Sequence, residues 1–257
     1  MRLTAFLVIS LLATVISGCL NAISVNSAPF RRGYYRLVTK IVGLRVVVRG
    51  LQNAERPHLV ISNHISYFDI VGLGSLVAGD FVAKADIAKW PIFGVMAKAG
   101  RSVFIERRPS ATTGARDQIQ DRLDAGDTLI MFPESTSGDG NYVKPFKSAL
   151  FTVATRQVTD SLGRSRSIAV QPVSLAYTRL NGLPLGVGWR PYVAWYGDME
   201  LGPHLWHAAK LGTLTVEVTF HPPVTLADFP NRKALAAHCD HVVRTEMACL
   251  LSGRSVA

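Results

Sequence analysis

The sequence predicts an α/β protein, in which helices flank a mixed central sheet and an N-terminal hydrophobic helix serves as a membrane anchor. Short apolar runs typical of buried strands alternate with segments of helical periodicity. The apolar share of 48% and the charged share of 18% exclude a disordered chain. The 257 residues provide one catalytic-sized domain with appendages, and the three scattered cysteines favour neither a disulfide framework nor a CxxC zinc site.

Residues 1–26 are predicted to anchor the chain in a membrane. No residue from Leu3 to Phe30 is charged, and the most apolar part is just long enough for a helix to cross a bilayer, which takes roughly 20 residues. A buried core helix is less favoured, because the apolar residues cover every face. Two alternatives remain open: a cleaved signal peptide with Arg2 as its basic start, and a lipoprotein signal that ends at Cys19.

Residues 27–50 are predicted to form a basic amphipathic segment on the membrane surface. The net charge of +10 is concentrated at the head of the chain, where residues 1–60 hold eight basic side chains and one acidic side chain. Six of the basic residues follow the uncharged stretch with no acid among them: Arg31, Arg32, Arg36, Lys40, Arg45 and Arg49. Such residues attract anionic lipids and favour the cytoplasmic side. We therefore expect the inner (cytoplasmic) membrane as the location, with the catalytic domain facing the cytoplasm. Nucleic acid is not an expected partner, because no helix-turn-helix, finger or RRM pattern is present.

The rest of the chain alternates predicted strands and helices. Apolar runs predict strands at residues 59–61, 81–83, 102–105, 128–132, 167–175, 192–195 and 214–220. The last run alternates apolar and polar residues, so we expect it to be half exposed. Helical patterns cover residues 115–125, which Gly126 ends, and a final helix from an Asn231 cap to about Leu251.

The segment Asn63–Asp69 follows a predicted strand and carries a candidate general base. His64 and Asp69 are five residues apart, so on one regular helix they would lie on different faces and only a turn brings them together. A carboxylate that binds one imidazole nitrogen leaves the other nitrogen to take a proton. Taken alone, the same residues also fit a helix-capping box of Ser66 and Asp69. No GxSxG pattern supports a hydrolase nucleophile.

Three further segments lie at predicted strand ends, and together with Asn63–Asp69 they resemble the ordered motif blocks of the glycerolipid acyltransferase family. The matching residues of these three blocks are Gly100, Phe104, Ile105 and Arg107; Phe132, Pro133, Glu134 and Thr136; and Val170, Pro172 and Val173. Residues 83–86 and 90–94 also look like the segment that usually joins the first two blocks. The resemblance covers roughly residues 50–180, and lysophosphatidic acid acyltransferases belong to this family.

This resemblance implies an acyltransferase domain over residues 51–257 that takes part in membrane lipid biosynthesis. A fatty acyl group would pass from acyl-CoA or acyl carrier protein, as co-substrate, to the hydroxyl of a lysolipid. His64 would deprotonate that hydroxyl and Asp69 would orient His64, with neither a metal nor a further cofactor. The substrate-binding residues that the resemblance implies are Asn63, Lys84, Gly100, Arg101, Phe104, Arg107, Glu134, Ser135 and Thr136.

Two departures from the family pattern bear on the acceptor. Ser135 stands where the family usually has glycine, and serine would bring strain if that position needs a positive φ. Residues 137–140 stand where many phosphatidate-forming members carry a basic residue, and residues 138–147 look more like the lyso-ornithine lipid acyltransferases. Lysophosphatidic acid and lyso-ornithine lipid are therefore both candidate acceptors. A lipid-anchored envelope lipoprotein and a lipid hydrolase are the alternative functions.

Overall fold

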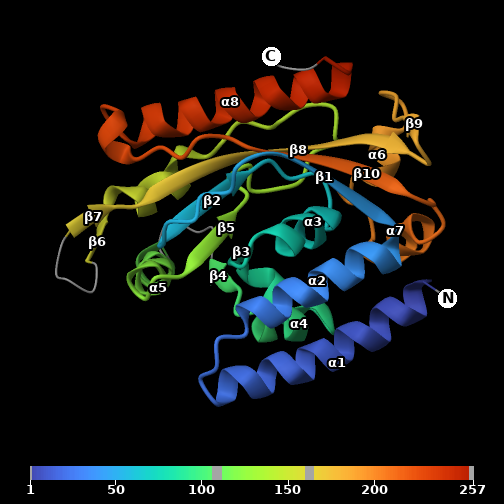
Figure 1. Ribbon diagram of the computed structural model, residues 1–257, viewed down its shortest axis with the longest axis horizontal. Helices are drawn as coiled ribbons and strands as arrows, with labels where there is room; N and C mark the ends of the chain where they lie inside the picture. Colours follow the sequence, from blue (N-terminus) through green and yellow to red (C-terminus); the bar gives the residue numbers. More distant parts are fainter. Residues whose placement is uncertain (1, 106–111, 160–164, 255–257) are drawn as a thin grey trace.

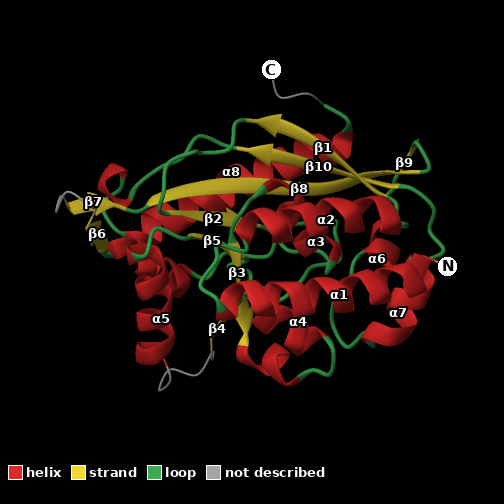
Figure 2. Cartoon of the chain, turned by 60° about the horizontal axis from the view of Figure 1, so that its bottom comes forward, coloured by secondary structure: helices red, strands yellow, loops and turns green. Residues whose placement is uncertain are grey.

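A mixed sheet forms the centre of the protein (Figures 1 and 2). The computed structural model describes residues 2–105, 112–159 and 165–254. Within these residues the sheet has eight strands in the order β1-β10-β8-β2-β5-β3-β4, and β9 pairs with β8. The strands are β1 (Leu44–Gly50), β2 (His58–Ser62), β3 (Asp80–Lys84), β4 (Val103–Ile105), β5 (Thr128–Met131), β8 (Ala169–Leu180), β9 (Leu183–Pro184) and β10 (Leu214–Phe220). A separate two-stranded antiparallel sheet pairs β6 (Gln157–Thr159) with β7 (Ser165–Ser167).

Helices cover both faces of this sheet, which confirms the predicted α/β class. Figure 1 shows α8 on one face, and α1, α2, α3 and α4 on the other. The helices are α1 (Arg2–Ala22), α2 (Ala28–Val42), α3 (Phe68–Leu76), α4 (Phe93–Ala99), α5 (Thr112–Asp124), α6 (Arg190–Val193), α7 (Leu201–Ala208) and α8 (Arg232–Ser252). Short 3₁₀ helices are η1 (Ala85–Lys89), η3 (Ser148–Thr155) and η4 (Leu226–Asp228).

The parallel strands bring the predicted motif blocks to one edge of the sheet. β2 runs parallel to β5 and to β8, with Ile61 beside both Met131 and Pro172. Every residue of β2 and β5 is buried, as expected of parallel strands that are covered on both faces. The loops that follow β2 and β5 therefore leave the sheet side by side. β8 has 12 residues and continues past the end of β2 at Ser62.

Most of the predicted elements are confirmed. The predicted strands that lie in β2, β3, β4, β5, β8 and β10 agree with the structure, as do both predicted helices. The Asn231 side chain caps α8 by accepting the backbone N–H groups of Lys233 and Ala234.

Two of the sequence predictions are wrong. The strand predicted at 192–195 overlaps helix α6, whose first turn holds Pro191, a residue that suits a helix start. β10 was expected to be half exposed, yet none of its residues is exposed. Its polar side faces the protein, where the Thr219 hydroxyl donates to Glu246 of α8 at 2.9 Å.

The predicted surface segment, residues 27–50, divides into two parts. Its first half is helix α2, whereas its second half is β1, which pairs in parallel with β10 along its whole length. Residues 44–50 are therefore part of the sheet, because their backbone groups complete its ladder. The basic residues of the whole 27–50 segment also differ in exposure: Lys40 and Arg45 are exposed, whereas Arg31 is buried.

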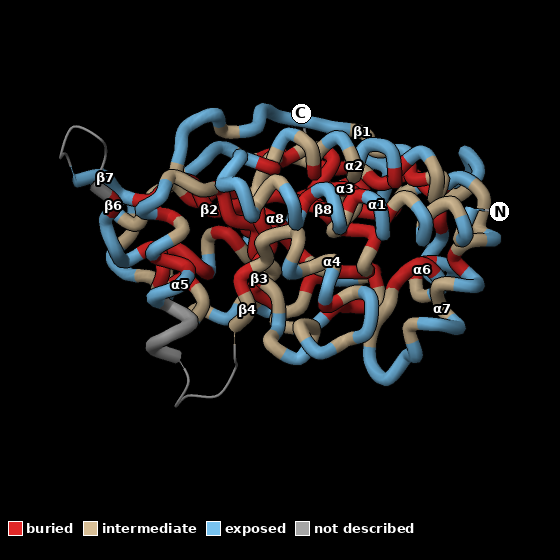
Figure 3. Tube along the Cα trace, turned by 90° about the horizontal axis from the view of Figure 1, so that it is seen from below, coloured by how far each residue is buried: buried red, intermediate tan, exposed pale blue. Residues whose placement is uncertain are grey.

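Helix α1 lies along the body of the protein. It is the one helix in the described part of the chain that is long and apolar enough to cross a membrane. A signal sequence can have the same length and composition. Small buried residues, Ser10, Ala13 and Ser17, form its inner face. Ser10 and Tyr34 of α2 share a hydrogen bond of 2.7 Å, and Asn21 donates to the carbonyl of Ala99 in α4 at 2.9 Å. Along α1, exposed and partly buried stretches alternate in Figure 3. The outer face is apolar and exposed: Leu7, Val8, Leu11, Leu12, Val15 and Ile16.

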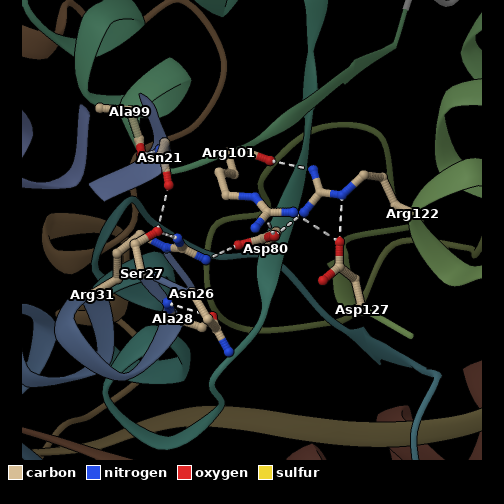
Figure 4. Close-up of polar contacts among 10 residues, drawn as sticks. All are labelled: Asn21, Asn26, Ser27, Ala28, Arg31, Asp80, Ala99, Arg101, Arg122 and Asp127. Atoms are coloured by element: carbon tan, nitrogen blue, oxygen red, sulfur yellow. Dashed lines mark hydrogen bonds and ion pairs between the residues drawn. The ribbon is translucent and has the colours of Figure 1, made fainter. Parts of the chain in front are cut away.

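A buried aspartate ties α2 to the sheet (Figure 4). Asp80, at the start of β3, accepts hydrogen bonds from Arg31 of α2 and from Arg122 of α5. Arg101 lies 3.7 Å from the same carboxylate and donates to Asp127 at 3.1 Å. Burial raises the pKa of Asp80, and the three arginines oppose this rise. The network is net positive and holds α2 against the sheet and α5.

Candidate active site

A tight loop between β2 and α3 brings His64 and Asp69 together. The Asp69 Oδ2 accepts a hydrogen bond from His64 Nδ1 at 2.8 Å, and it also accepts the backbone N–H groups of Ile65 at 2.6 Å and Ser66 at 2.9 Å. Asp69 is fully buried, whereas 20% of the His64 side chain is exposed. The two interpretations of this segment are therefore compatible: one carboxylate closes the turn before α3 and orients the imidazole.

The ring of Phe132 fixes the plane of the imidazole. It stacks on His64 with ring centroids 4.2 Å apart and an interplanar angle of 15°. With Nδ1 held by Asp69, no described residue hydrogen bonds to His64 Nε2. The sequence analysis placed Phe132 in a motif block but gave it no role. Its position directly after a buried strand, beside the end of β2, is the signal that could have suggested one.

Glu134 connects its own loop, which follows β5, with the loop that follows β2. Its Oε1 accepts the backbone N–H of His64 at 2.6 Å, and its Oε2 accepts that of Lys144 at 2.7 Å. Burial raises its pKa to about 8, a rise that these two N–H donors partly offset. The carboxylate was expected to bind substrate, but its two oxygens are occupied by backbone groups. Its role in the structure is to hold the His64 loop.

Ser135 has the positive φ at which serine, standing in place of the usual glycine, was expected to bring strain. Its φ is +69°, in the left-handed region that glycine tolerates best. The position therefore requires positive φ, and serine occupies it at a conformational cost.

An apolar cavity of about 490 Å³ adjoins His64. It extends under α1 and α2, which contribute Leu3, Phe6, Ala13, Phe30 and Tyr34 to its wall. Of the expected site residues, the cavity wall includes His64, Lys84, Gly100, Ser135 and Thr136. Lys84 also forms an ion pair with Asp86. The volume of the cavity and its largely apolar wall suit a hydrocarbon chain.

Besides Glu134, three expected substrate-binding residues in the described part of the chain do not line this cavity. The amide of Asn63 pairs with the backbone of Leu175 in β8, donating at 3.0 Å and accepting at 2.8 Å. Arg101 belongs to the Asp80 network, and Phe104 lies in β4 away from the cavity wall. The polar groups of Asn63 and Arg101 already have protein partners, and their contact with substrate stays a prediction. Arg107 lies outside the described residues.

Tyr177 is a further member of the site that the sequence analysis missed. From β8 its hydroxyl donates to Asp69 Oδ1 at 2.6 Å. Its place in an otherwise apolar strand, four residues after Val173 of the last motif block, is the signal that could have drawn attention to it.

The chemistry available at this site is that of a base without a protein nucleophile. No described hydroxyl or thiol hydrogen bonds to the imidazole, and burial raises the pKa of the Cys239 thiol in α8 to about 12. The described residues contain no cluster of three metal-ligating side chains. An imidazole oriented in this way is suited to take a proton from a hydroxyl that enters the cavity.

The chain is similar to several proteins of known description. A family model described as Acyltransferase matches residues 45–176. A lyso-ornithine lipid O-acyltransferase of Brucella abortus is 40% identical over 224 residues, which are 87% of this chain and 83% of that protein. A protein with the same description from Rhizobium meliloti is 38% identical, over 87% of this chain and 76% of that protein.

More distant similarities extend the comparison. A 1-acyl-sn-glycerol-3-phosphate acyltransferase of Neisseria gonorrhoeae is 28% identical over 87% of this chain and 82% of that protein. The crystal structure of the 1-acyl-sn-glycerophosphate acyltransferase PlsC from Thermotoga maritima superposes with a TM-score of 0.59 at 22% identity, covering 100% of both chains. This structural likeness supports the fold.

Proposed function

This chain belongs to the acyltransferase family, and we propose that it transfers a fatty acyl group from a thioester to the hydroxyl of a lyso-ornithine lipid. An activity on lysolipids is common to the relatives described above. The observation that carries the proposal is the buried Asp69 that orients His64 at the wall of an apolar cavity.

In the proposed reaction His64 acts as the general base. Its Nε2 takes the proton of the acceptor hydroxyl as the hydroxyl oxygen attacks the thioester carbonyl. The tetrahedral intermediate then collapses, the carbon–sulfur bond breaks, and the proton passes from His64 to the leaving thiolate. Asp69 holds the imidazole with Nδ1 protonated throughout, and stabilises the imidazolium that forms. No covalent acyl-enzyme and no metal take part in this scheme.

The loop beside Thr136 favours an acceptor without a phosphate. Ser137 donates to the carbonyl of Trp195, and Asp139 accepts from the backbone N–H of Asn141 at 3.0 Å. Lys144 of this loop donates its Nζ to the carbonyl of Ser137 at 2.8 Å. This chain is also more similar to the lyso-ornithine enzymes, at 40% and 38% identity, than to the glycerophosphate enzyme at 28%.

The acyl donor in this proposal is acyl-CoA or acyl carrier protein, and the site of action is the cytoplasmic face of the inner membrane. The exposed apolar face of α1 and the exposed cations Lys40 and Arg45 support a membrane location. Membrane lipids are the proposed partners at this face of the membrane. The thioester donor would reach the site from the aqueous phase on the same face.

A transfer assay tests this function. Full-length protein in lipid vesicles would be supplied with lyso-ornithine lipid or lysophosphatidic acid, each with acyl-CoA or acyl carrier protein as donor. We expect ornithine lipid as the main product by mass spectrometry. Preference for lysophosphatidic acid would contradict the acceptor, and release of free fatty acid in place of transfer would indicate a hydrolase.

A further inference from the structure

The Asp69 carboxylate is held by four donors that come from two different parts of the fold. Three of them, His64 Nδ1 and the N–H groups of Ile65 and Ser66, belong to its own loop and converge on Oδ2. The fourth is the hydroxyl of Tyr177, which lies 108 residues away and binds Oδ1. Among the described residues, Tyr177 is therefore the contact that ties this carboxylate to the sheet.

Strand β8 provides a rigid support for this contact. It pairs with β2 as far as Ser62 and then continues alongside the catalytic loop. Leu175 binds the amide of Asn63 through its backbone, and Tyr177, two residues further on the same face, binds Asp69. The loop is therefore held to one strand at both its beginning and its end.

The hydroxyl of Tyr177 can act only as a donor in this position. Tyr177 is 2% exposed, and burial together with the nearby charge of Asp69 raises its pKa well above the usual value. The phenol therefore stays protonated at every pH at which the protein would be assayed. Asp69 is the acceptor of a charge-assisted hydrogen bond, which is stronger than a neutral one.

We infer that Tyr177 is a positioning residue for acyl transfer, an inference that rests on the proposed function of His64 and Asp69. Its hydroxyl fixes Oδ1, so the carboxylate keeps Oδ2 directed at His64 Nδ1. It also draws negative charge from the carboxylate and so limits how strongly Asp69 stabilises the protonated imidazole. Tyr177 does not line the cavity, and its contribution is to the proton transfer rather than to substrate binding.

The substitution Tyr177→Phe tests this inference, because it removes the hydroxyl and keeps the ring. With lyso-ornithine lipid and an acyl donor, we expect kcat to fall roughly tenfold, in the range for a lost hydrogen bond to a charged group, and KM to change less than about twofold. The charge on Asp69 becomes more concentrated, which favours the imidazolium. The acid limb of the pH profile should therefore move to higher pH.

The matched control is Ser174→Ala, which removes a buried hydroxyl from the opposite face of the same strand. Ser174 bonds to His221 at 2.8 Å, on the side of helix α8. This variant should keep the wild-type pH profile. Equal losses of kcat and identical pH profiles in both variants would assign the effect to packing and overturn the inference. A wild-type kcat and pH profile in Tyr177→Phe would also overturn it.

A second measurement needs no activity. The Nδ1–H proton of His64, assigned by NMR through its loss in His64→Ala, should shift in Tyr177→Phe and not in Ser174→Ala. An unchanged resonance in Tyr177→Phe would overturn the positioning role. If the protein transferred no acyl group to any lysolipid, the proposed function would fail, while this measurement would still decide how Tyr177 acts on the pair.

Discussion

Glu134 accepts the backbone N–H of His64 at 2.6 Å, so the loop after β5 holds the loop after β2. Two motif blocks that are 70 residues apart thus form one unit. The carboxylate does not contact the cavity directly. Its effect on the site passes through the backbone position of His64.

The substitution His64→Ala should abolish acyl transfer and leave the fold intact. A positioned general base contributes about 10²- to 10⁴-fold to rate, and no described side chain lies ready to replace it. Transfer assays and circular dichroism would measure the two effects. His241→Ala is the control, because His241 is exposed on α8. This helix covers the face of the sheet opposite to α1 and α2, which line the cavity (Figure 1). Near-normal activity in His64→Ala would refute the assignment of the base.

Glu134 should make stability depend on pH. Its pKa is about 8 in the folded protein and about 4.5 when exposed, so between these values the folded state binds the extra proton. The stability that this group contributes is complete below about pH 4.5 and is lost as the pH rises through 8. Glu134→Gln should remove this dependence, and should cost about 1–2 kcal/mol because its amide can accept only one of the two N–H groups.

Urea unfolding between pH 5 and 8.5 would measure this change. Glu200→Gln, at an exposed position, is the control that should keep the wild-type pH dependence. The same pH dependence in Glu134→Gln and in the wild type would show that another group is responsible.

Position 135 should accept glycine better than a β-branched residue. At φ +69° a β-branched side chain is a steric outlier, so Ser135→Val should lower the free energy of unfolding by about 1–3 kcal/mol. Ser135→Gly relieves the strain but makes the unfolded chain more flexible, so its effect should lie within about 1 kcal/mol of zero. Thermal unfolding of the pair would compare them, and equal stability of both variants would contradict a positive φ at this position.

Removal of the Asp80 charge should loosen the N-terminal helices. Asp80→Asn leaves the buried Arg31 without its carboxylate, and the loss of one partner from a buried pair costs about 3 kcal/mol or more. Hydrogen exchange in α2 should rise together with the loss of stability. Asp117→Asn breaks an exposed pair with Arg156 and should change stability by less than about 1 kcal/mol. A variant Asp80→Asn as stable as Asp117→Asn would show that Asp80 does not secure α2.

The sequence alone predicted the α/β class and the pairing of His64 with Asp69. Both depend on local information: apolar runs of strand length, and a carboxylate five residues from a histidine at a strand end. The acyltransferase resemblance followed from the same ordered blocks. The α8 helix with its Asn231 cap was predictable for a similar reason, since a cap acts within its own turn.

Only the tertiary structure decided what each polar side chain binds. Asn63, Arg101 and Glu134 belong to the motif blocks, but each already has a partner within the protein: Leu175, Asp80 and His64, respectively. The sequence could not show this, because those partners come from segments that are distant along the chain. The same holds for Tyr177, which reaches Asp69 only because β8 continues past the end of β2. Strand register and burial, which are properties of the whole sheet, set these contacts.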